Sequence, residues 1–117
     1  MPYVSIRASQ HLTDEKIERI QKEMGRIITI IPGKTSENCM TQIAGDCKTF
    51  MGGVSINAAF CEVRMLGKAP SENKNEFTVE LNNVLSTELE GLERLYLNFQ
   101  EYYEWGVGPN YREIEKP

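Results

Sequence analysis

Few side chains in this sequence have the types and spacing that catalysis or metal binding requires. His11 is the single histidine and lies in a predicted loop, where a solvated role is the usual one. Ser–His–Asp, Cys–His and histidine-based zinc chemistry would each have to start from His11, which argues against all three. Cys39, Cys47 and Cys61 form an odd set without C-x-x-C spacing. In a reducing compartment this pattern predicts buried thiols and no metal site.

Pro2 offers another chemistry, that of a secondary amine. Removal of Met1 by the usual aminopeptidase, which accepts proline as the second residue, would free the Pro2 nitrogen. Proton transfer beside a carbonyl group needs a base active near neutral pH, and burial plus a nearby cation such as Lys34 would lower the pKa of the amine accordingly. Candidates for an apolar wall are Tyr3, Leu66, Phe99 and Trp105. Alternatively, Pro2 simply begins a strand.

A strand and a helix should position Pro2 and Lys34. Residues 3–7 alternate with the period of a strand. Thr13, followed by Asp14 and Glu15, is a typical helix start with acids in the first turn. An apolar stripe at helical spacing follows, formed by Ile17, Ile20, Met24, Ile27, Ile28 and Ile31. Pro32-Gly33 ends this helix, residues 38–50 are predicted to be extended, and residues 51–53 form a turn or bulge.

The second half of the chain repeats this scheme. A strand is predicted within residues 54–66, and Pro70-Ser71-Glu72 opens a second helix with Ser71 as its expected N-cap. The apolar stripe of that helix consists of Phe77, Leu81, Val84, Leu85 and Leu89. Residues 94–99 are predicted to form another strand, and residues 106–109 to break up the tail. The order is β-α-β-β-α-β, an α+β fold made of two βαβ halves.

The handedness of these halves has a consequence for assembly. Right-handed crossovers place both helices on one face of a four-stranded sheet. The other face is then uncovered, and an exposed sheet face of this size usually marks an interface. The architecture alone therefore predicts an oligomer.

Composition narrows the function classes. The 117 residues predict one domain over 1–117, with 40% hydrophobic and 26% charged residues, as in ordinary globular proteins. The formal net charge of −4, with acids and bases mixed, argues against a nucleic-acid surface. No apolar run approaches a membrane span, and the N-terminus lacks the regions of a signal peptide. We expect a cytoplasmic protein, although export without a signal peptide would leave no mark in the sequence.

Several short motifs in a fixed order point to a family. They are Met1-Pro2-Tyr3-Val4, Gly33-Lys34, residues 50–53 (Phe-Met-Gly-Gly), Leu66-Gly67-Lys68 and residues 95–99 (Leu-Tyr-Leu-Asn-Phe). From Pro2 to about Phe99 the sequence resembles the macrophage migration inhibitory factor family of the tautomerase superfamily. The resemblance implies a homotrimer with active sites between subunits, in which no cofactor is used. It also implies an enzyme that interconverts the keto and enol forms of phenylpyruvate-like α-keto acids.

The resemblance also implies roles for individual residues. Pro2 would be the catalytic acid–base, and Lys34 would bind the substrate carboxylate rather than serve only as a cation at a helix C-terminus. The backbone amide of Leu66 would help hold the substrate. Asn98 and Tyr96 would reach in from the neighbouring subunit, or else be ordinary strand residues. Tyr3 would contribute to the pocket wall.

The sequence also departs from the family pattern. Residues 35–38 contain no tyrosine to line the pocket after the lysine, and the C-x-x-C motif of vertebrate members is missing. Arg64 stands where those members have a histidine; it would add a bidentate grip on a carboxylate or be an exposed strand residue. The tail over residues 102–108 aligns poorly.

The alternatives to a keto–enol tautomerase are a non-catalytic trimeric binding or signalling protein and another superfamily reaction on unsaturated acids. The second of these would draw on Arg7, Arg64 and Glu62.

Overall fold

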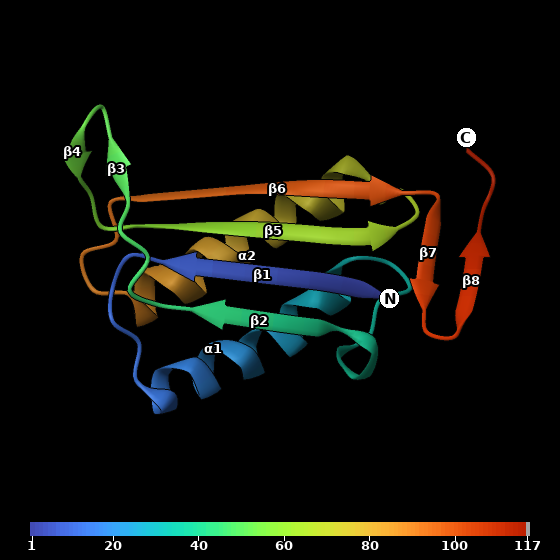
Figure 1. The fold of residues 1–117 in the computed structure, drawn as a ribbon, viewed down its shortest axis with the longest axis horizontal. Coiled ribbons are helices and arrows are strands. Elements are labelled where there is room, and N and C mark those ends of the chain that lie inside the picture. Colours follow the sequence, from blue (N-terminus) through green and yellow to red (C-terminus); the bar gives the residue numbers. More distant parts are fainter. Residues whose placement is uncertain (117) are drawn as a thin grey trace.

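The computed structural model describes residues 1–116 and is built around one four-stranded sheet (Figure 1). Its strands, in the spatial order β2-β1-β5-β6, are Met40–Ala44, Pro2–Ala8, Ala58–Leu66 and Arg94–Tyr102. β1 is parallel to β2 and β5 is parallel to β6, whereas β1 and β5 are antiparallel. Each half is thus a parallel pair joined through a helix, which confirms the predicted β-α-β-β-α-β order and α+β class.

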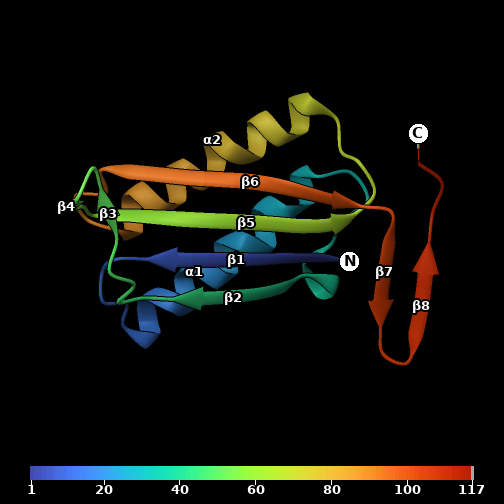
Figure 2. The same cartoon turned by 45° about the horizontal axis from the view of Figure 1, so that its top comes forward.

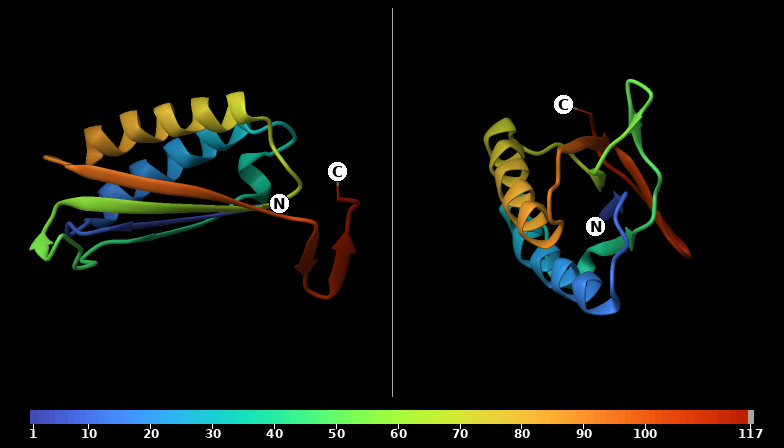
Figure 3. Two further views of the ribbon diagram at one scale, coloured as in Figure 1. Left: turned by 90° about the horizontal axis from the view of Figure 1, so that it is seen from above. Right: turned by 90° about the vertical axis from the view of Figure 1, so that its left-hand side faces the viewer.

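Two helices, α1 (Asp14–Ile27) and α2 (Ser71–Glu88), cover the same face of this sheet (Figure 3). Thr13 caps α1 as predicted, since its hydroxyl accepts a hydrogen bond from the Lys16 backbone N–H at 3.2 Å. Two short 3₁₀ turns, Ile28–Ile30 and Ser36–Asn38, then lead from α1 to β2.

The predicted N-cap of α2 is wrong. Ser71 is already helical, and the cap residue is Pro70, which makes no side-chain cap bond. The Pro70 carbonyl accepts the N–H groups of Asn73 and Lys74 at 3.1 and 3.2 Å. Proline has a fixed φ that suits the start of a helix. Here Pro70 is extended and occupies the N-cap position, one residue before Ser71.

The core lies between the helices and the sheet. Alternate residues of β1 and β5, such as Val4, Ile6 and Val63, are fully buried against the apolar stripes of the helices. The stripe residues with no more than 1% exposure are Ile20, Met24, Ile27, Ile28, Ile31, Phe77, Leu81, Leu85 and Leu89. Burying one such side chain contributes roughly 1.5–3 kcal/mol, so both helices are held to this face by their predicted stripes.

Two small hairpins extend from the ends of the sheet. β3 (Phe50–Met51) and β4 (Val54–Ser55) are joined through Gly52 and Gly53, whose positive φ values of 59° and 80° fit the predicted turn. The stretch 38–50 is extended only in part, because β2 covers Met40–Ala44 and residues 45–49 belong to no strand. β6 also continues beyond the predicted residue 99, to Tyr102.

The second hairpin corrects the expectation for the tail. β7 (Glu104–Val107) and β8 (Asn110–Glu113) pair in antiparallel fashion, with Gly108-Pro109 as the turn between them. Pro109 lacks an N–H donor, but the turn needs none from it. The residues expected to interrupt structure instead close a hairpin, which stands beside the N-terminus at one end of the sheet (Figure 2).

The face of the sheet opposite the helices is uncovered, as predicted (Figure 3). Along each strand it presents the residues that alternate with the core, for example Tyr3, Arg64 and Tyr96. We call this surface the open face. No helix within residues 1–116 is long and apolar enough to cross a membrane.

Candidate functional site

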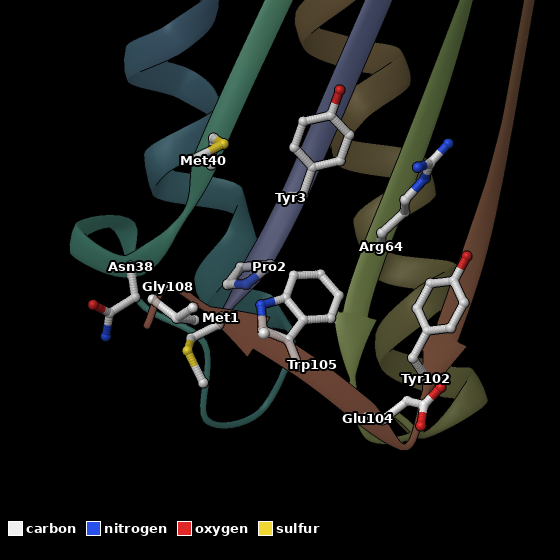
Figure 4. Close-up of a pocket in the computed structure, with 12 residues that line it drawn as sticks. Met1, Pro2, Tyr3, Asn38, Met40, Arg64, Tyr102, Glu104, Trp105 and Gly108 are labelled. Atoms are coloured by element: carbon white, nitrogen blue, oxygen red, sulfur yellow. The ribbon is translucent and has the colours of Figure 1, made fainter. Parts of the chain in front are cut away.

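A pocket of about 770 Å³ lies at the end of the sheet where β1 begins and β5 and β6 end. The antiparallel register pairs Pro2 with Met65, so the start of β1 meets the end of β5. The β7–β8 hairpin closes one side, so that residues far apart in sequence share one cavity. The lining includes Pro2, Tyr3, Met40, Arg64, Tyr102 and Trp105 (Figure 4). We call this region the Pro2 end.

Pro2 is buried at this end and is the first residue of β1. Tyr3 and Trp105 line the same pocket, and Figure 4 shows the Trp105 indole beside Pro2. Leu66 is also buried, but it borders a separate small depression with Lys34. The structure therefore places Tyr3 and Trp105 around Pro2 as expected.

Phe99 does not belong to this wall, contrary to the expectation. Its ring packs edge-on against Phe77 of α2, with the ring centroids 5.5 Å apart. Side chains alternate along β6, and Phe99 falls on the helix-facing side while Tyr102 falls on the open face. The alternation of the extended strand thus excludes Phe99 from the pocket.

Lys34 approaches the start of the chain from the loop after α1. Its ammonium donates a hydrogen bond to the Leu66 carbonyl at 3.0 Å, so the side chain is anchored across the end of β5. Met1 is present in this structure, and the pKa of its amino group is lowered by burial first and by the neighbouring Lys34 ammonium second. An amine at this place is therefore biased toward its neutral form.

Arg64 lies on the open face beside the pocket. Its guanidinium donates a hydrogen bond to Glu62 at 2.8 Å and lies over the Tyr3 ring, 5.7 Å from the ring centroid. Gln100 also donates to Glu62, at 3.2 Å, and the Tyr102 hydroxyl donates to Gln100 at 2.8 Å. Arg64 is therefore held within a polar row that crosses from β1 to β6.

Tyr96 and Asn98 lie away from the Pro2 pocket. Tyr96 is paired with Phe60 and Asn98 with Glu62, and neither lines the cavity around Pro2. Tyr96 instead borders a hollow of about 640 Å³ at the opposite end of the sheet. The residues around this hollow include Arg7, Phe50, Phe60, Arg94 and Tyr96, and we call the region the Tyr96 end. Within one chain the two groups of predicted site residues are not brought together.

Sequence reasoning missed several residues of the pocket. Met40, Tyr102 and Glu104 line it, the last two because β6 runs on into the β7–β8 hairpin. The signal for that hairpin was the Gly108-Pro109 turn between extended segments. Met40 joins the pocket because β2 pairs with β1 so that Met40 faces Tyr3.

Other reactive side chains lie outside the pocket. Cys61 is buried, and burial raises the pKa of its thiol to about 12, whereas Cys39 and Cys47 are only half-buried. His11 is exposed and contacts Asp46 at 3.1 Å. Over residues 1–116 no group of three or more His, Cys, Asp or Glu side chains is arranged to hold a metal ion.

Comparison with a protein-family model decides the relationship. The model for macrophage migration inhibitory factor (MIF) matches residues 1–112. The chain belongs to the macrophage migration inhibitory factor family. A comparison with curated protein sequences finds no match.

Solved structures share the MIF fold at low identity. MIF2 from Leishmania major superposes with a TM-score of 0.85 at 21% identity, covering 96% of this chain and 97% of that one. The MIF-like protein of Entamoeba histolytica gives a TM-score of 0.81 at 23% identity, with 95% and 98% coverage. Pt0534, in a crystal structure of the protein inactivated by 2-oxo-3-pentynoate, gives 0.73 at 17% identity, with 92% and 93% coverage.

Proposed function

We propose that this MIF-family chain is a keto–enol tautomerase for phenylpyruvate-like α-keto acids. The Pro2 amine, free after removal of Met1, would be its general acid–base. The observation that carries the proposal is the combination at the Pro2 end: a buried Pro2 in a largely apolar pocket, with the Lys34 ammonium beside the amino terminus. Both features lower the pKa of an amine, as they do for the Met1 amino group.

The proposed reaction needs one group that both gives and takes a proton. In the enol-to-keto direction the neutral Pro2 amine takes the proton of the enol hydroxyl as the carbonyl forms and gives a proton to the enol carbon, so it ends neutral again. In the reverse direction the neutral amine removes a proton from that carbon and gives a proton to the oxygen. A base with a pKa near the working pH does both steps efficiently.

Lys34 and Leu66 would position the substrate. The Lys34 ammonium has donors beyond its bond to the Leu66 carbonyl, and a substrate carboxylate would accept one of them. The backbone amide of Leu66, at the end of β5, would hold the substrate beside it. Tyr3 and Trp105 offer apolar walls for a phenyl ring.

The proposal includes a homotrimer. Tyr96 and Asn98 lie on the open face, and Tyr96 is 49% exposed. Packing of the Tyr96 end of one copy against the Pro2 end of the next would add both residues to the pocket. This arrangement is heterologous, and a rotation that closes it gives a ring.

One comparison supports the substrate class. A protein with the same fold is inactivated by 2-oxo-3-pentynoate, which is itself a 2-oxo acid. Another superfamily reaction on unsaturated acids has less support here, because Glu62, the carboxylate that would activate water, accepts hydrogen bonds from Arg64 and Gln100. We therefore favour tautomerisation.

The decisive experiment blocks the Pro2 nitrogen without changing the ring. A variant with one alanine added before Pro2 turns the amine into an amide, so phenylpyruvate tautomerisation should fall by about 10²–10⁴-fold. Pro2→Gly leaves a primary amine in place, so its activity should fall less. Mass spectrometry of the parent checks that Met1 is absent, and the pH–rate profile should show a base with a pKa well below that of an ordinary secondary amine.

Two results would separate the alternatives. If the alanine-extended protein is folded and as active as the parent, Pro2 is not the base. If the parent lacks Met1 and is inactive on phenylpyruvate, the non-catalytic binding protein becomes the better description.

A further inference from the structure

The pocket has a cation in its own lining, Arg64, besides Lys34, which borders the separate depression at Leu66. Arg64 belongs to the lining, and it precedes Leu66, the anchor of Lys34, by two residues on β5. Two residues of a strand span roughly 7 Å. Lys34 is bonded to the Leu66 carbonyl, whereas the Arg64 guanidinium is bonded to Glu62, so the two cations are anchored at different residues of β5.

The side chain of Arg64 is fixed from several directions. Glu62 accepts its hydrogen bond at 2.8 Å and is itself held by Gln100 at 3.2 Å. The Tyr3 ring lies against the guanidinium, 5.7 Å from centroid to Cζ. Within residues 1–116 the guanidinium makes this one side-chain hydrogen bond, so most of its N–H donors remain for another acceptor.

The pocket lining beside Arg64 is largely apolar. In Figure 4 the Trp105 indole lies between Pro2 and Arg64, and the guanidinium lies on the side away from Trp105. Glu104, an acid of the lining, accepts a hydrogen bond from the Tyr111 hydroxyl at 3.0 Å. A ligand that extends from Lys34 past Trp105 would thus meet a cation, an apolar wall and a second cation in turn.

We propose that the pocket selects 2-oxo acids that carry a second carboxylate at the far end of an apolar middle. Arg64 receives this distal carboxylate, and Glu62 is a positioning residue that holds the guanidinium. The inference rests on the proposed function, because Lys34 binds the 2-oxo acid group beside Pro2. Charge-assisted bonds from an arginine fork suit a carboxylate, and the same fork gives a neutral ring substituent no comparable gain.

The test uses three substrates that differ only in the para position of the ring. They are phenylpyruvate, 4-carboxyphenylpyruvate and the methyl ester of that para carboxylate, each corrected for its uncatalysed rate. For the parent, kcat/KM of the para carboxylate should exceed that of the ester by about three- to tenfold, a range that allows for the exposure of Arg64. Arg64→Gln should bring this ratio close to one, and Arg64→Lys should give an intermediate ratio.

A matched control removes a charge outside the pocket. Lys22 is exposed on α1, on the helix-covered side of the sheet, so Lys22→Gln should keep the parent ratio. Glu62→Ala should lower the ratio through a higher KM for the para carboxylate, because no side-chain acceptor within residues 1–116 is then left to hold the guanidinium. Circular dichroism and sedimentation of each variant check that it is folded and assembled as the parent is.

The outcomes separate this inference from the proposed function. If the parent tautomerises all three compounds but the ratio stays near one, or if Arg64→Gln keeps the parent ratio, the inference is wrong and the tautomerase stands. If the parent acts on none of the three compounds, the inference and the proposed tautomerase function are both wrong. A ratio that falls to about one in Arg64→Gln and keeps the parent value in Lys22→Gln supports the distal carboxylate.

Discussion

The two ends of the four-stranded sheet differ in what they expose. At the Pro2 end the apolar groups turn toward a cavity, and Pro2 itself is buried. At the Tyr96 end the aromatic side chains face outward, with exposures of 62% for Phe50, 38% for Phe60 and 49% for Tyr96. One end has a candidate base without all of its predicted partners, and the other has those partners without a base. In the proposed trimer, each end would supply one half of the site.

The largest expected effect comes from mixing two variants that damage opposite ends. The alanine-extended protein lacks the Pro2 amine, and a Tyr96→Ala, Asn98→Ala double variant lacks the residues proposed to come from the neighbouring copy. Each alone should be nearly inactive. After unfolding and refolding together, about a quarter of the sites would combine an intact Pro2 end with an intact Tyr96 end, so activity should return. Each variant refolded by itself is the control.

The same experiment can contradict the proposal that the two ends share a site. If mixed oligomers form, as tagged subunits would show, and yet no activity returns, the two ends do not share a site. Full activity of the double variant alone would likewise remove Tyr96 and Asn98 from the mechanism.

Assembly itself gives the next prediction. Sedimentation of the parent should give about three times 13.4 kDa, and Phe50→Lys at the Tyr96 end should reduce this mass because it places a charge in the contact. Val79 is a matched control, since it is 52% exposed on α2, away from the open face. Val79→Lys should leave the mass unchanged. A parent that sediments as a monomer at micromolar concentration would contradict the shared site.

Two lysine variants test whether the charge of Lys34 binds the substrate carboxylate. Lys34→Ala should raise KM for phenylpyruvate by about tenfold or more, as expected for loss of a charge-assisted hydrogen bond. Lys22, which is exposed on α1 on the helix-covered side of the sheet, is the control, and Lys22→Ala should change KM little. An unchanged KM in Lys34→Ala would mean that Lys34 does not bind the substrate and serves only as a cation near the C-terminus of α1.

The helix-covered face could be predicted from sequence because it depends on periodicity. The alternation around Val4 and Ile6 and the stripe around Phe77 each fix one face of an element, and the structure buries those faces together. The prediction for Ser71 is wrong because its type suits a cap, but Pro70, one residue earlier, already takes that position. The prediction for Phe99 is wrong because side chains alternate along β6, which turns Phe99 toward the helices and away from the pocket.

The site was predictable only in part for a similar reason. Pro2 and Lys34 belong to segments that the first βαβ half brings together, so their proximity follows from that half. Tyr102 and Glu104 depend on the β7–β8 hairpin, and its turn, Gly108-Pro109, is equally typical of an irregular tail. Tyr96 and Asn98 lie where a single chain gives them no contact with Pro2. Contacts between copies leave no periodic signal in one sequence.

The smallest effect concerns how β6 is fixed beside the Pro2 end. The Glu101 carboxylate accepts the Ala69 backbone N–H at 2.6 Å and pairs with the Lys74 ammonium at 2.8 Å. Burial alone would raise the pKa of Glu101, but these two partners outweigh it, and the pKa is lowered. A carboxylate with a lowered folded-state pKa contributes stability above its unfolded pKa of about 4.3, and that contribution is lost as the pH falls through the folded value.

Glu101→Gln should therefore lower the free energy of unfolding by roughly 1–3 kcal/mol at pH 7, and the difference from the parent should shrink as the pH falls below about 4. Urea unfolding at a fixed protein concentration measures this, because assembly makes stability depend on concentration. Glu93 provides the comparison at the other end: it accepts the Asn57 backbone N–H at 2.8 Å but is exposed, so Glu93→Gln should cost less. If Glu101→Gln costs the same at pH 7 and at low pH, the ionised carboxylate is not what holds β6 against the loop before α2.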